Sequence, residues 1–419
     1  MKKVLIIGHF WPYRGGSKRM IGLAKYLSEF GWEPIILTGP LNRKPDIGAK
    51  YIEVEYRNIF GFRSKIDLSD QISYKVQNTP PFFKKLLRNL FKYIAEVIAY
   101  PDEYKYWKYP VIESVKDILK EEKIDAMISV WPVTSHIIAK ELKAKYGIAW
   151  IADFPDLWSQ NYCYSYGPIR KFFDRRLEAK TIKSADILTS ISQPLAEKMK
   201  ELHKEKQIYS ITHGFDPIKV NNLSSNLTNK FTITYTGQIY KGKQDPSKFL
   251  TALKNLISNR IINPNDVEVR FYGPKLDWLE TMIRNYRLSG IVKQYGMIPH
   301  EDSIKKQWES QLLILFSWED KKRKGVYTGK IFEYLAAQRP ILATGGISSD
   351  VVEDLLKETN AGVYSSDIDD IQKKLKKFYL EYKQKGRVDY AGNIGKINQY
   401  SHREMAKKFA DILNKIIKT

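Results

Sequence analysis

Residues 325–342 read GVYTGKIFEYLAAQRPIL, and this stretch predicts a loop and a helix, followed by an apolar run. A glycine-marked loop at 327–329 opens the helix, which ends at Gln338-Arg339-Pro340 before an apolar run. The N-terminus of a helix presents free N–H groups that suit a phosphate, and Lys330 adds a mobile cation. Glu333, three residues further on, faces the same side and can accept hydrogen bonds from hydroxyl groups. The pattern is therefore typical of a nucleotide-sugar site, although an ordinary helix with Lys330 and Glu333 as a solvated pair has the same spacing.

The composition favours a folded, two-domain protein with anionic partners. The chain has 419 residues and 43% hydrophobic residues, enough for two cores. The single cysteine, Cys163, excludes an internal disulfide and fits a reducing cytosol. No run reaches the roughly 18 apolar residues of a spanning helix, and residues 4–7 are interpreted as a buried strand and not as part of a signal peptide. The net charge of +22 comes without a nucleic-acid motif, which favours a membrane surface or a phosphorylated ligand and no nucleic acid.

Strands and helices alternate along both halves of the chain, which predicts two parallel, doubly wound α/β sheets. The predicted strands are 4–7, 33–37, 126–130, 149–152, 187–190 and 208–211 in the first half, and 232–235, 267–272 and 312–316 in the second. An Asn- and Ser-rich linker at 221–230 separates a domain at 1–220 from a domain at 231–399. We expect the C-terminal helix, 400–419, to pack back on the first domain, and the two domains to face a central cleft.

Residues 81–99 form an amphipathic pattern that suits the surface of a membrane, with apolar and aromatic side chains opposite basic ones. The expected membrane contacts are Phe83, Lys84, Lys85, Leu87, Arg88 and Phe91. The alternative is a surface helix whose apolar stripe packs on the sheet.

Short motifs in a fixed order run along nearly the whole chain. They are HFWP at 9–12, GGS at 15–17, DFPDLW at 153–158, SADILTSIS at 184–192, HGFD at 213–216, YTGQIYKGK at 235–243, FYG at 271–273, YGMIP at 295–299 and the helix with Lys330 and Glu333. With these motifs the chain resembles the family-four glycosyltransferases of the GT-B architecture. The resemblance implies that a sugar is transferred with retention from a nucleotide diphosphate-sugar, without a bound metal or cofactor. It also implies that the second domain binds the donor and the first domain the acceptor.

The same resemblance assigns a set of donor-binding residues, all of them in the second domain except Gly16. Cations and N–H dipoles stabilise the charge that builds on the leaving diphosphate. The expected donor-binding residues are Gly16, Gln238, Lys241, Lys243, Gly273, Met297, Ile298, Tyr327, Thr328, Gly329, Lys330 and Glu333. Glu333 matches the glutamate that holds the ribose hydroxyls, and the backbone at 296–298 would lie near the base.

Two positions of the second domain depart from the family pattern. Gln238 stands where an arginine is common, so Lys241 or Lys243 must compensate for one phosphate cation. Gly325 stands where many members have a glutamate that contacts the sugar, so Tyr327 or Glu319 takes over that contact.

The candidate catalytic residues of the first domain are Asp156, Asp153 and His136. Asp156 stands where many family members have a histidine, and an aspartate can orient a sugar hydroxyl or act as a base. The alternatives are a turn-capping role for Asp156 and a structural role at a helix start for His136. The acid pair at 367–369 is interpreted as pairing with a helix dipole, and no histidines have metal-ligand spacing.

The sequence therefore predicts a hexosyltransferase-type glycosyltransferase (EC 2.4). It would be cytoplasmic, peripheral at the inner face of the membrane, and would act on a cell-surface glycan or a lipid-linked saccharide. The alternatives are a non-catalytic binding or partner protein of the same fold, and a sugar-nucleotide epimerase or hydrolase.

Overall fold

The computed structural model describes residues 1–9, 17–41, 47–57, 96–162, 164, 166–217, 226–320, 323–347 and 350–418. The chain divides into two compact units, which are described separately. Unit 1 comprises Met1–Ile211 and Ala406–Thr419, and unit 2 comprises Thr212–Met405. Within the described residues, no helix combines the length and apolar character that crossing a bilayer requires.

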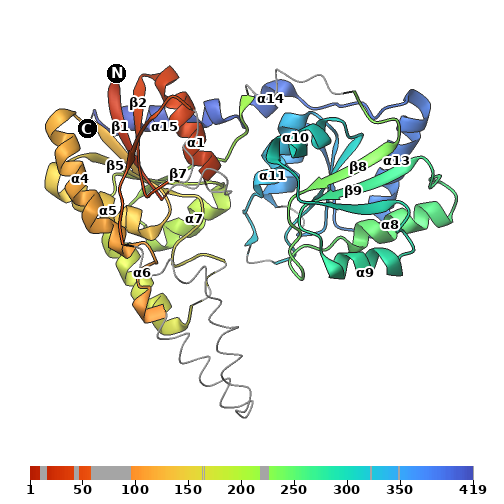
Figure 1. The fold of residues 1–419 in the computed structure, drawn as a ribbon, viewed down its shortest axis with the longest axis horizontal. Helices are drawn as coiled ribbons and strands as arrows, with labels where there is room; N and C mark the ends of the chain where they lie inside the picture. The colour runs from red at the N-terminus through yellow and green to blue at the C-terminus, as the bar shows by residue number, and fades with distance from the viewer. Residues whose placement is uncertain are drawn as a thin grey trace, which may run out of the picture. The chain divides into compact units, whose positions relative to one another are not determined.

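Unit 1 is built on a seven-stranded sheet in which every neighbouring pair is parallel (Figure 1). Its strand order is β3-β2-β1-β4-β5-β6-β7. The strands are β1 (Lys2–Ile7), β2 (Trp32–Thr38), β3 (Lys50–Glu53), β4 (Ala126–Ser129), β5 (Ala149–Phe154), β6 (Ile187–Ser190) and β7 (Gln207–Ser210). The central strands are covered on both faces, which is why they are apolar runs and not alternating patterns.

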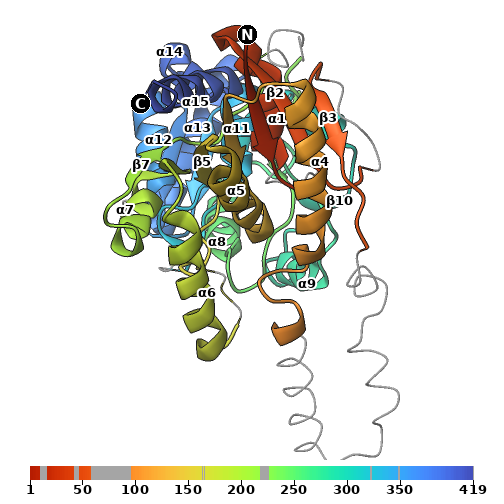
Figure 2. The same ribbon diagram turned by 90° about the vertical axis from the view of Figure 1, so that its left-hand side faces the viewer.

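Helices cover both faces of this sheet. They are α1 (Ser17–Tyr26), η1 (Leu27–Phe30), η3 (Lys105–Trp107), α4 (Lys108–Glu121), α5 (Val133–Tyr146), α6 (Pro168–Ile182), α7 (Gln193–Leu202) and α15 (His402–Ile416). Helix α5 lies between α4 and α6 (Figure 2). The C-terminal helix α15 reaches unit 1, where Nζ of Lys415 donates to Tyr209 Oη at 3.0 Å and Phe409 lies against the guanidinium of Arg19.

Unit 2 has a six-stranded parallel sheet in the order β10-β9-β8-β11-β12-β13. Its strands are β8 (Phe231–Thr236), β9 (Val267–Tyr272), β10 (Val292–Gly296), β11 (Leu312–Phe316), β12 (Ile341–Thr344) and β13 (Gly362–Ser365). Its helices are α8 (Ser247–Ser258), α9 (Asp277–Asn285), α10 (His300–Trp308), α11 (Gly329–Ala337), α12 (Val351–Thr359), α13 (Ile368–Lys385) and α14 (Ile394–Asn398). Two separate hydrophobic cores form, one beneath α8, α9 and α13 and one beneath α10, α11 and α12.

The predicted fold class, two doubly wound parallel sheets, is confirmed. All nine strands predicted from the sequence are present. In each sheet successive strands are added first on one side and then on the other. The strand order changes side once, between β1 and β4 in unit 1 and between β8 and β11 in unit 2. Ligands of open parallel sheets bind outside the carboxyl ends of the strands at this switch point. The loops after these strands are therefore where a site is expected in each unit.

Candidate functional site

Helix α11 begins at the switch point of unit 2 with uncapped backbone N–H groups. Thr328 occupies the N-cap position in an extended conformation, but its side chain makes no capping hydrogen bond. Its Oγ1 is buried and has no hydrogen-bond partner within the described part of the chain. Gly329 follows as an exposed first helical residue, without a side chain to cover the helix end. The first turn thus offers N–H donors and one hydroxyl to an anion.

Lys330 extends from this first turn across the end of β8. Its Nζ lies 3.4 Å from the carbonyl oxygen of Gln238 and 5.3 Å from the centre of the Tyr235 ring. Gly237 adopts a φ of +98°, and a Cβ at that position would lie 2.5 Å from Cε of Lys330. Only glycine permits this path for the lysine side chain, so the loop after β8 and helix α11 together aim the ammonium group.

Glu333 lies one turn further along α11, and buried polar groups orient it. Nε2 of Gln307, a fully buried residue of α10, donates to Oγ1 of Thr236 at 3.0 Å and to Oε2 of Glu333 at 3.4 Å. Nε2 of His300 lies 4.0 Å from Oε1 of Glu333. Tyr334 Oη accepts a hydrogen bond from the Thr236 amide at 3.0 Å, which fixes α11 to the end of β8. The carboxylate is therefore held in place while its side chain stays 21% exposed.

Glycines bring the ends of β8, β9 and β10 close together beside this helix. The amide of Gly273 donates to the carbonyl of Gly296 at 3.0 Å, and a Cβ on Gly273 would lie 2.4 Å from the carbonyl oxygen of Gly237. The side chain of Met297 is 75% exposed and Ile298 is half-buried. A flat ligand can therefore approach the backbone at 296–298 without meeting a bulky wall.

The other donor-side candidates lie around the same strand ends in less confined positions. Gln238, Lys241 and Lys243 are exposed, and Lys241 lines an open hollow with Trp278 of α9. The carbonyl of Lys243 accepts a hydrogen bond from the Glu319 amide, and the carboxylate of Glu319 accepts one from the Gly346 amide, each at 2.9 Å.

The ring of Tyr327 packs on Phe332 with 5.4 Å between centroids, and burial raises the pKa of its hydroxyl. Tyr327 therefore stays neutral and can act as a hydrogen-bond donor. Gly16 lies outside the described residues, as do the expected membrane contacts Phe83, Lys84, Lys85, Leu87, Arg88 and Phe91.

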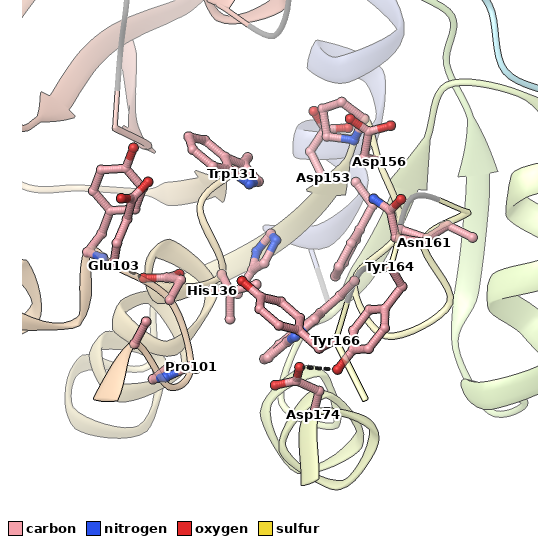
Figure 3. A pocket seen from close by; sticks show the side chains of 18 residues that line it. Pro101, Glu103, Trp131, His136, Asp153, Asp156, Asn161, Tyr164, Tyr166 and Asp174 are labelled. Atoms are coloured by element: carbon pink, nitrogen blue, oxygen red, sulfur yellow. Dashed lines mark hydrogen bonds between the residues drawn. The ribbon is translucent and has the colours of Figure 1, made fainter. Parts of the chain in front are cut away.

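Unit 1 contains a cavity of about 400 Å³ that brings the three catalytic candidates together (Figure 3). Asp153 is the penultimate residue of β5, Asp156 follows the strand, and His136 comes from the first turns of α5. Because β5 and α5 both lie next to β4, the strand at the switch point, the fold places these residues on one wall.

Asp153 lies in a buried ion pair, which is the environment of a residue that stabilises the fold. Its side chain is fully buried, and its two carboxylate oxygens accept hydrogen bonds from Nε and Nη2 of Arg19 at 2.7 and 2.9 Å. Oγ1 of Thr189 donates to the same carboxylate at 2.6 Å. An ion pair in which one guanidinium donates two hydrogen bonds to one carboxylate holds α1 to the sheet.

His136 is also buried, and its imidazole is neutral at physiological pH. Nδ1 lies 2.7 Å from Oγ of Ser129, and the ring stacks on Phe154 at 4.5 Å. Burial lowers the pKa of His136 to about 3. Asp156 differs from both neighbours because it is exposed, and Tyr162 Oη donates to its Oδ1 at 3.1 Å. Of the three candidates, Asp156 has the environment that an acid or base in contact with substrate requires.

Sequence reasoning missed the residues that orient these groups. Gln307 and Arg19 carry no local motif, and each acts on a partner at least 26 residues away in the sequence. Only their burial in the folded chain identifies them. Within the described ranges, no group of three or more His, Cys, Asp or Glu side chains is arranged to hold a metal ion.

Comparisons with known proteins identify the fold. No family model and no curated protein matches the sequence. Among solved structures, a glycosyltransferase from Rickettsia africae ESF-5 is 14% identical, with a TM-score of 0.64 over 100% of this chain and 99% of that one. The lipopolysaccharide outer core galactosyltransferase WaaB is 15% identical, with a TM-score of 0.57 over 99% of each chain. A structure described as "Trehalose-6-phosphate from E. coli bound with UDP-2-fluoro glucose" is 11% identical, with a TM-score of 0.61 over 99% of each chain. The chain has the GT-B fold, as the sequence predicts.

Proposed function

We propose that this protein is a retaining, hexosyltransferase-type glycosyltransferase that uses a nucleotide diphosphate-sugar as donor. The observation that carries the proposal is the start of α11, where uncapped N–H groups, Lys330 and an oriented Glu333 share one helix. Phosphate and ribose require this combination of a cationic tip and an acceptor on the flank. Retention of configuration and independence from a metal or cofactor come from the family resemblance.

The proposed chemistry assigns a step to each group in unit 2. The bond between C1 of the donor sugar and the phosphate oxygen breaks, and the diphosphate leaves with the electron pair. An acceptor hydroxyl forms the new bond to C1, and its proton passes to the leaving diphosphate. The N–H groups at 328–329 and the ammonium of Lys330 stabilise the charge on the leaving diphosphate, with Lys241 or Lys243 in the place of an arginine at Gln238. Glu333 binds the ribose, the backbone at 297–298 and Gly273 border the base, and Tyr327 contacts the sugar.

The acceptor would bind in unit 1, with Asp156 in contact with its hydroxyl group. We propose a cell-surface glycan or a lipid-linked saccharide as acceptor, which is consistent with a fold neighbour, WaaB, that is a lipopolysaccharide outer core galactosyltransferase. A net charge of +22 would bring the protein to the anionic inner face of the membrane as a peripheral, cytoplasmic enzyme.

One observation favours a second candidate, a non-catalytic binding protein of the same fold. Gln238 has an amide where the resemblance expects a cation, which weakens the stabilisation of a leaving diphosphate. Such a protein would bind nucleotide or saccharide without turnover. A sugar-nucleotide epimerase or hydrolase would instead convert the donor without an acceptor.

Calorimetric titration with UDP, GDP and ADP and their common sugar conjugates, without divalent metal, tests the proposal. Micromolar binding of one nucleotide is expected, and Glu333→Ala should weaken it by about 10- to 100-fold, because a hydrogen bond to a charged group contributes about 1.5–3 kcal/mol. Glu301→Ala, an exposed glutamate at the start of α10, is the matched control. Unchanged affinity in Glu333→Ala would remove the ribose assignment. Binding without transfer to any acceptor would favour the non-catalytic candidate.

A further inference from the structure

The unit 1 cavity has a wall of aromatic rings and carboxylic acids. The rings belong to Tyr104, Trp131, Phe154, Trp158, Tyr164 and Tyr166. The acids are Asp102, Glu103, Asp153, Asp156 and Asp174. No lysine or arginine lines the cavity within the described ranges, although the chain as a whole carries 69 of them and a net charge of +22. The described lining of this cavity is therefore acidic, whereas the protein as a whole is strongly basic.

Among the described residues, Arg19 and Arg170 lie near the wall, and both are withdrawn behind it. Arg19 is fully buried and bonded to Asp153. Arg170 is 8% exposed, donates through Nε to Oδ2 of Asp174 at 3.1 Å, and stacks under the rings of Tyr100 and Tyr166 at 4.7 and 4.4 Å. Each guanidinium is matched to a wall carboxylate and covered by rings, so neither presents a positive charge to a ligand.

Two further carboxylates lie at the cavity, together with polar groups that can also donate hydrogen bonds, such as the Asn161 amide and the Tyr166 hydroxyl. Glu103 and Asp156 are exposed at the wall. Asp174 accepts from Tyr164 Oη at 2.5 Å and from Arg170 through Oδ2, while its Oδ1 is buried and has no hydrogen-bond partner in the described part of the chain (Figure 3). Carboxylate oxygens accept hydrogen bonds from hydroxyl and ammonium groups, and they repel phosphates and other carboxylates.

Trp131 adds a flat surface to these acceptors. It precedes α5, its side chain is 52% exposed, and the Tyr104 ring meets it edge-on at 5.3 Å. Such a ring offers its face to the apolar side of a sugar and attracts a cation if the sugar carries an amine. The cavity volume of about 400 Å³ lies within the range of about 300–1,000 Å³ that is usual for small-molecule sites.

We infer that the sugar residue occupying the unit 1 cavity carries no negative charge: it is a neutral or amino-substituted sugar, stacked on Trp131 and held by Asp156 and Glu103. The inference rests on the proposed function and narrows its acceptor. Saccharides whose reacting end is a uronic acid or a phosphorylated sugar are excluded from the cavity by its carboxylates.

Ligand-observed NMR with the full chain at pH 7 and constant ionic strength tests the inference. The probes share one ring and differ in charge: methyl glucoside, methyl glucosaminide, methyl glucuronide and glucose 6-phosphate. The neutral and amino sugars should bind at least about tenfold more tightly than the two anionic ones, because like charges at the wall repel. Equal or tighter binding of either anionic sugar overturns the inference.

Variants test whether the discrimination arises at this cavity. Asp156→Asn combined with Glu103→Gln should reduce the ratio between glucoside and glucuronide affinities to about threefold or less, while Asp117→Asn, an exposed acid of α4 paired with Lys120, should leave it unchanged. Trp131→Ala should weaken all bound sugars by about three- to tenfold, and Tyr109→Ala, an aromatic residue 69% exposed on α4, should not. A ratio unchanged by the double variant overturns the inference.

The same samples separate this inference from the proposed function. Nucleotide binding without binding of any of the four sugars would overturn the inference and leave the donor assignment standing. Sugar binding in the expected order without nucleotide binding would support the inference and overturn the donor assignment.

Discussion

The two units place their candidate sites at equivalent positions of equivalent sheets and give them opposite chemistry. In unit 2 the loop after β8 meets a helix start with free N–H groups and Lys330, which is an environment for an anion. In unit 1 the wall beside β4 and β5 carries five carboxylic acids and exposes no described cation. The parallel sheet determines where a ligand binds, and a few side chains at that edge determine which ligand it is.

The units also differ in how they hold their polar groups. Unit 1 balances buried wall carboxylates with buried arginines, as in the pairs Arg19–Asp153 and Arg170–Asp174. At the candidate site of unit 2 the orienting groups are neutral, since Gln307, Thr236 and Tyr334 orient Glu333 and anchor its helix. Mutations of these buried ion pairs in unit 1 are therefore expected to affect stability, whereas mutations at the start of α11 should affect ligand binding.

The largest expected effect separates two neighbouring aspartates of unit 1. Asp153→Ala leaves the guanidinium of Arg19 buried without its partner and should lower the free energy of unfolding of unit 1 by about 3–5 kcal/mol. Asp156→Ala, at an exposed position, should change it by less than about 0.5 kcal/mol and abolish transfer instead. Urea unfolding followed by circular dichroism measures the first effect. Equal stability of the two variants would contradict the structural role of Asp153.

In unit 2 the largest expected effect is on ligand affinity. Lys330→Ala removes the cation beside the start of α11 and should reduce nucleotide affinity by about 1.5–3 kcal/mol, or roughly 10- to 100-fold. Stability should change much less, because the contacts of Nζ with the Gln238 carbonyl oxygen, at 3.4 Å, and with the Tyr235 ring, at 5.3 Å, are both long. Calorimetry and urea unfolding on the same sample measure both quantities. A stability loss with normal nucleotide binding would contradict the expectation that the start of α11 serves ligand binding and not stability.

The neutral His136 in the wall of unit 1 predicts a dependence of stability on pH. Its pKa is about 3 in the folded chain, below the ordinary value of 6.5, so the unfolded chain takes up the proton first. The stabilisation is fully present above pH 6.5 and is lost as the pH falls towards 3, by about 1.4 kcal/mol per pH unit, or about 2 kcal/mol between pH 6.5 and 5. His136→Gln should lack this loss. Burial also lowers the pKa of His9, to about 4. His9 is present in both the wild type and His136→Gln, so its contribution to the pH dependence cancels when the two are compared.

The fold was predictable because apolar strands and helical periodicity repeat in both halves, as in the runs at 4–7 and 312–316. Of the four strands that the sequence analysis did not predict, β3, β10 and β13 are short and only partly buried, so they lack an apolar run. The fourth, β12, was noted only as the apolar run after the helix. In the sites, Lys330 and Glu333 were identifiable because they share one helix and its spacing. The structural environment of Asp153 was not, because it depends on Arg19, 134 residues away, and on Thr189 from the next strand. A sequence motif records which residues are present, but burial and pairing arise only when distant segments pack together.

The smallest expected effects belong to the exposed lysines of unit 2. Lys241 and Lys243 are proposed to supply the cation that Gln238 lacks, but both side chains are exposed to solvent and Lys241 borders an open hollow beside α9. Each substitution by alanine should therefore reduce nucleotide affinity by only about 0.2–1 kcal/mol, less than Lys330→Ala, because solvent and salt screen exposed charges. Calorimetry at low and high salt measures this difference, with Lys293→Ala, an exposed lysine of β10, as the control. If both variants bind nucleotide and turn over like the wild type at low salt, the phosphate contacts belong to α11 alone. The difference in ligand chemistry between the units then depends on the start of α11 and on Lys330.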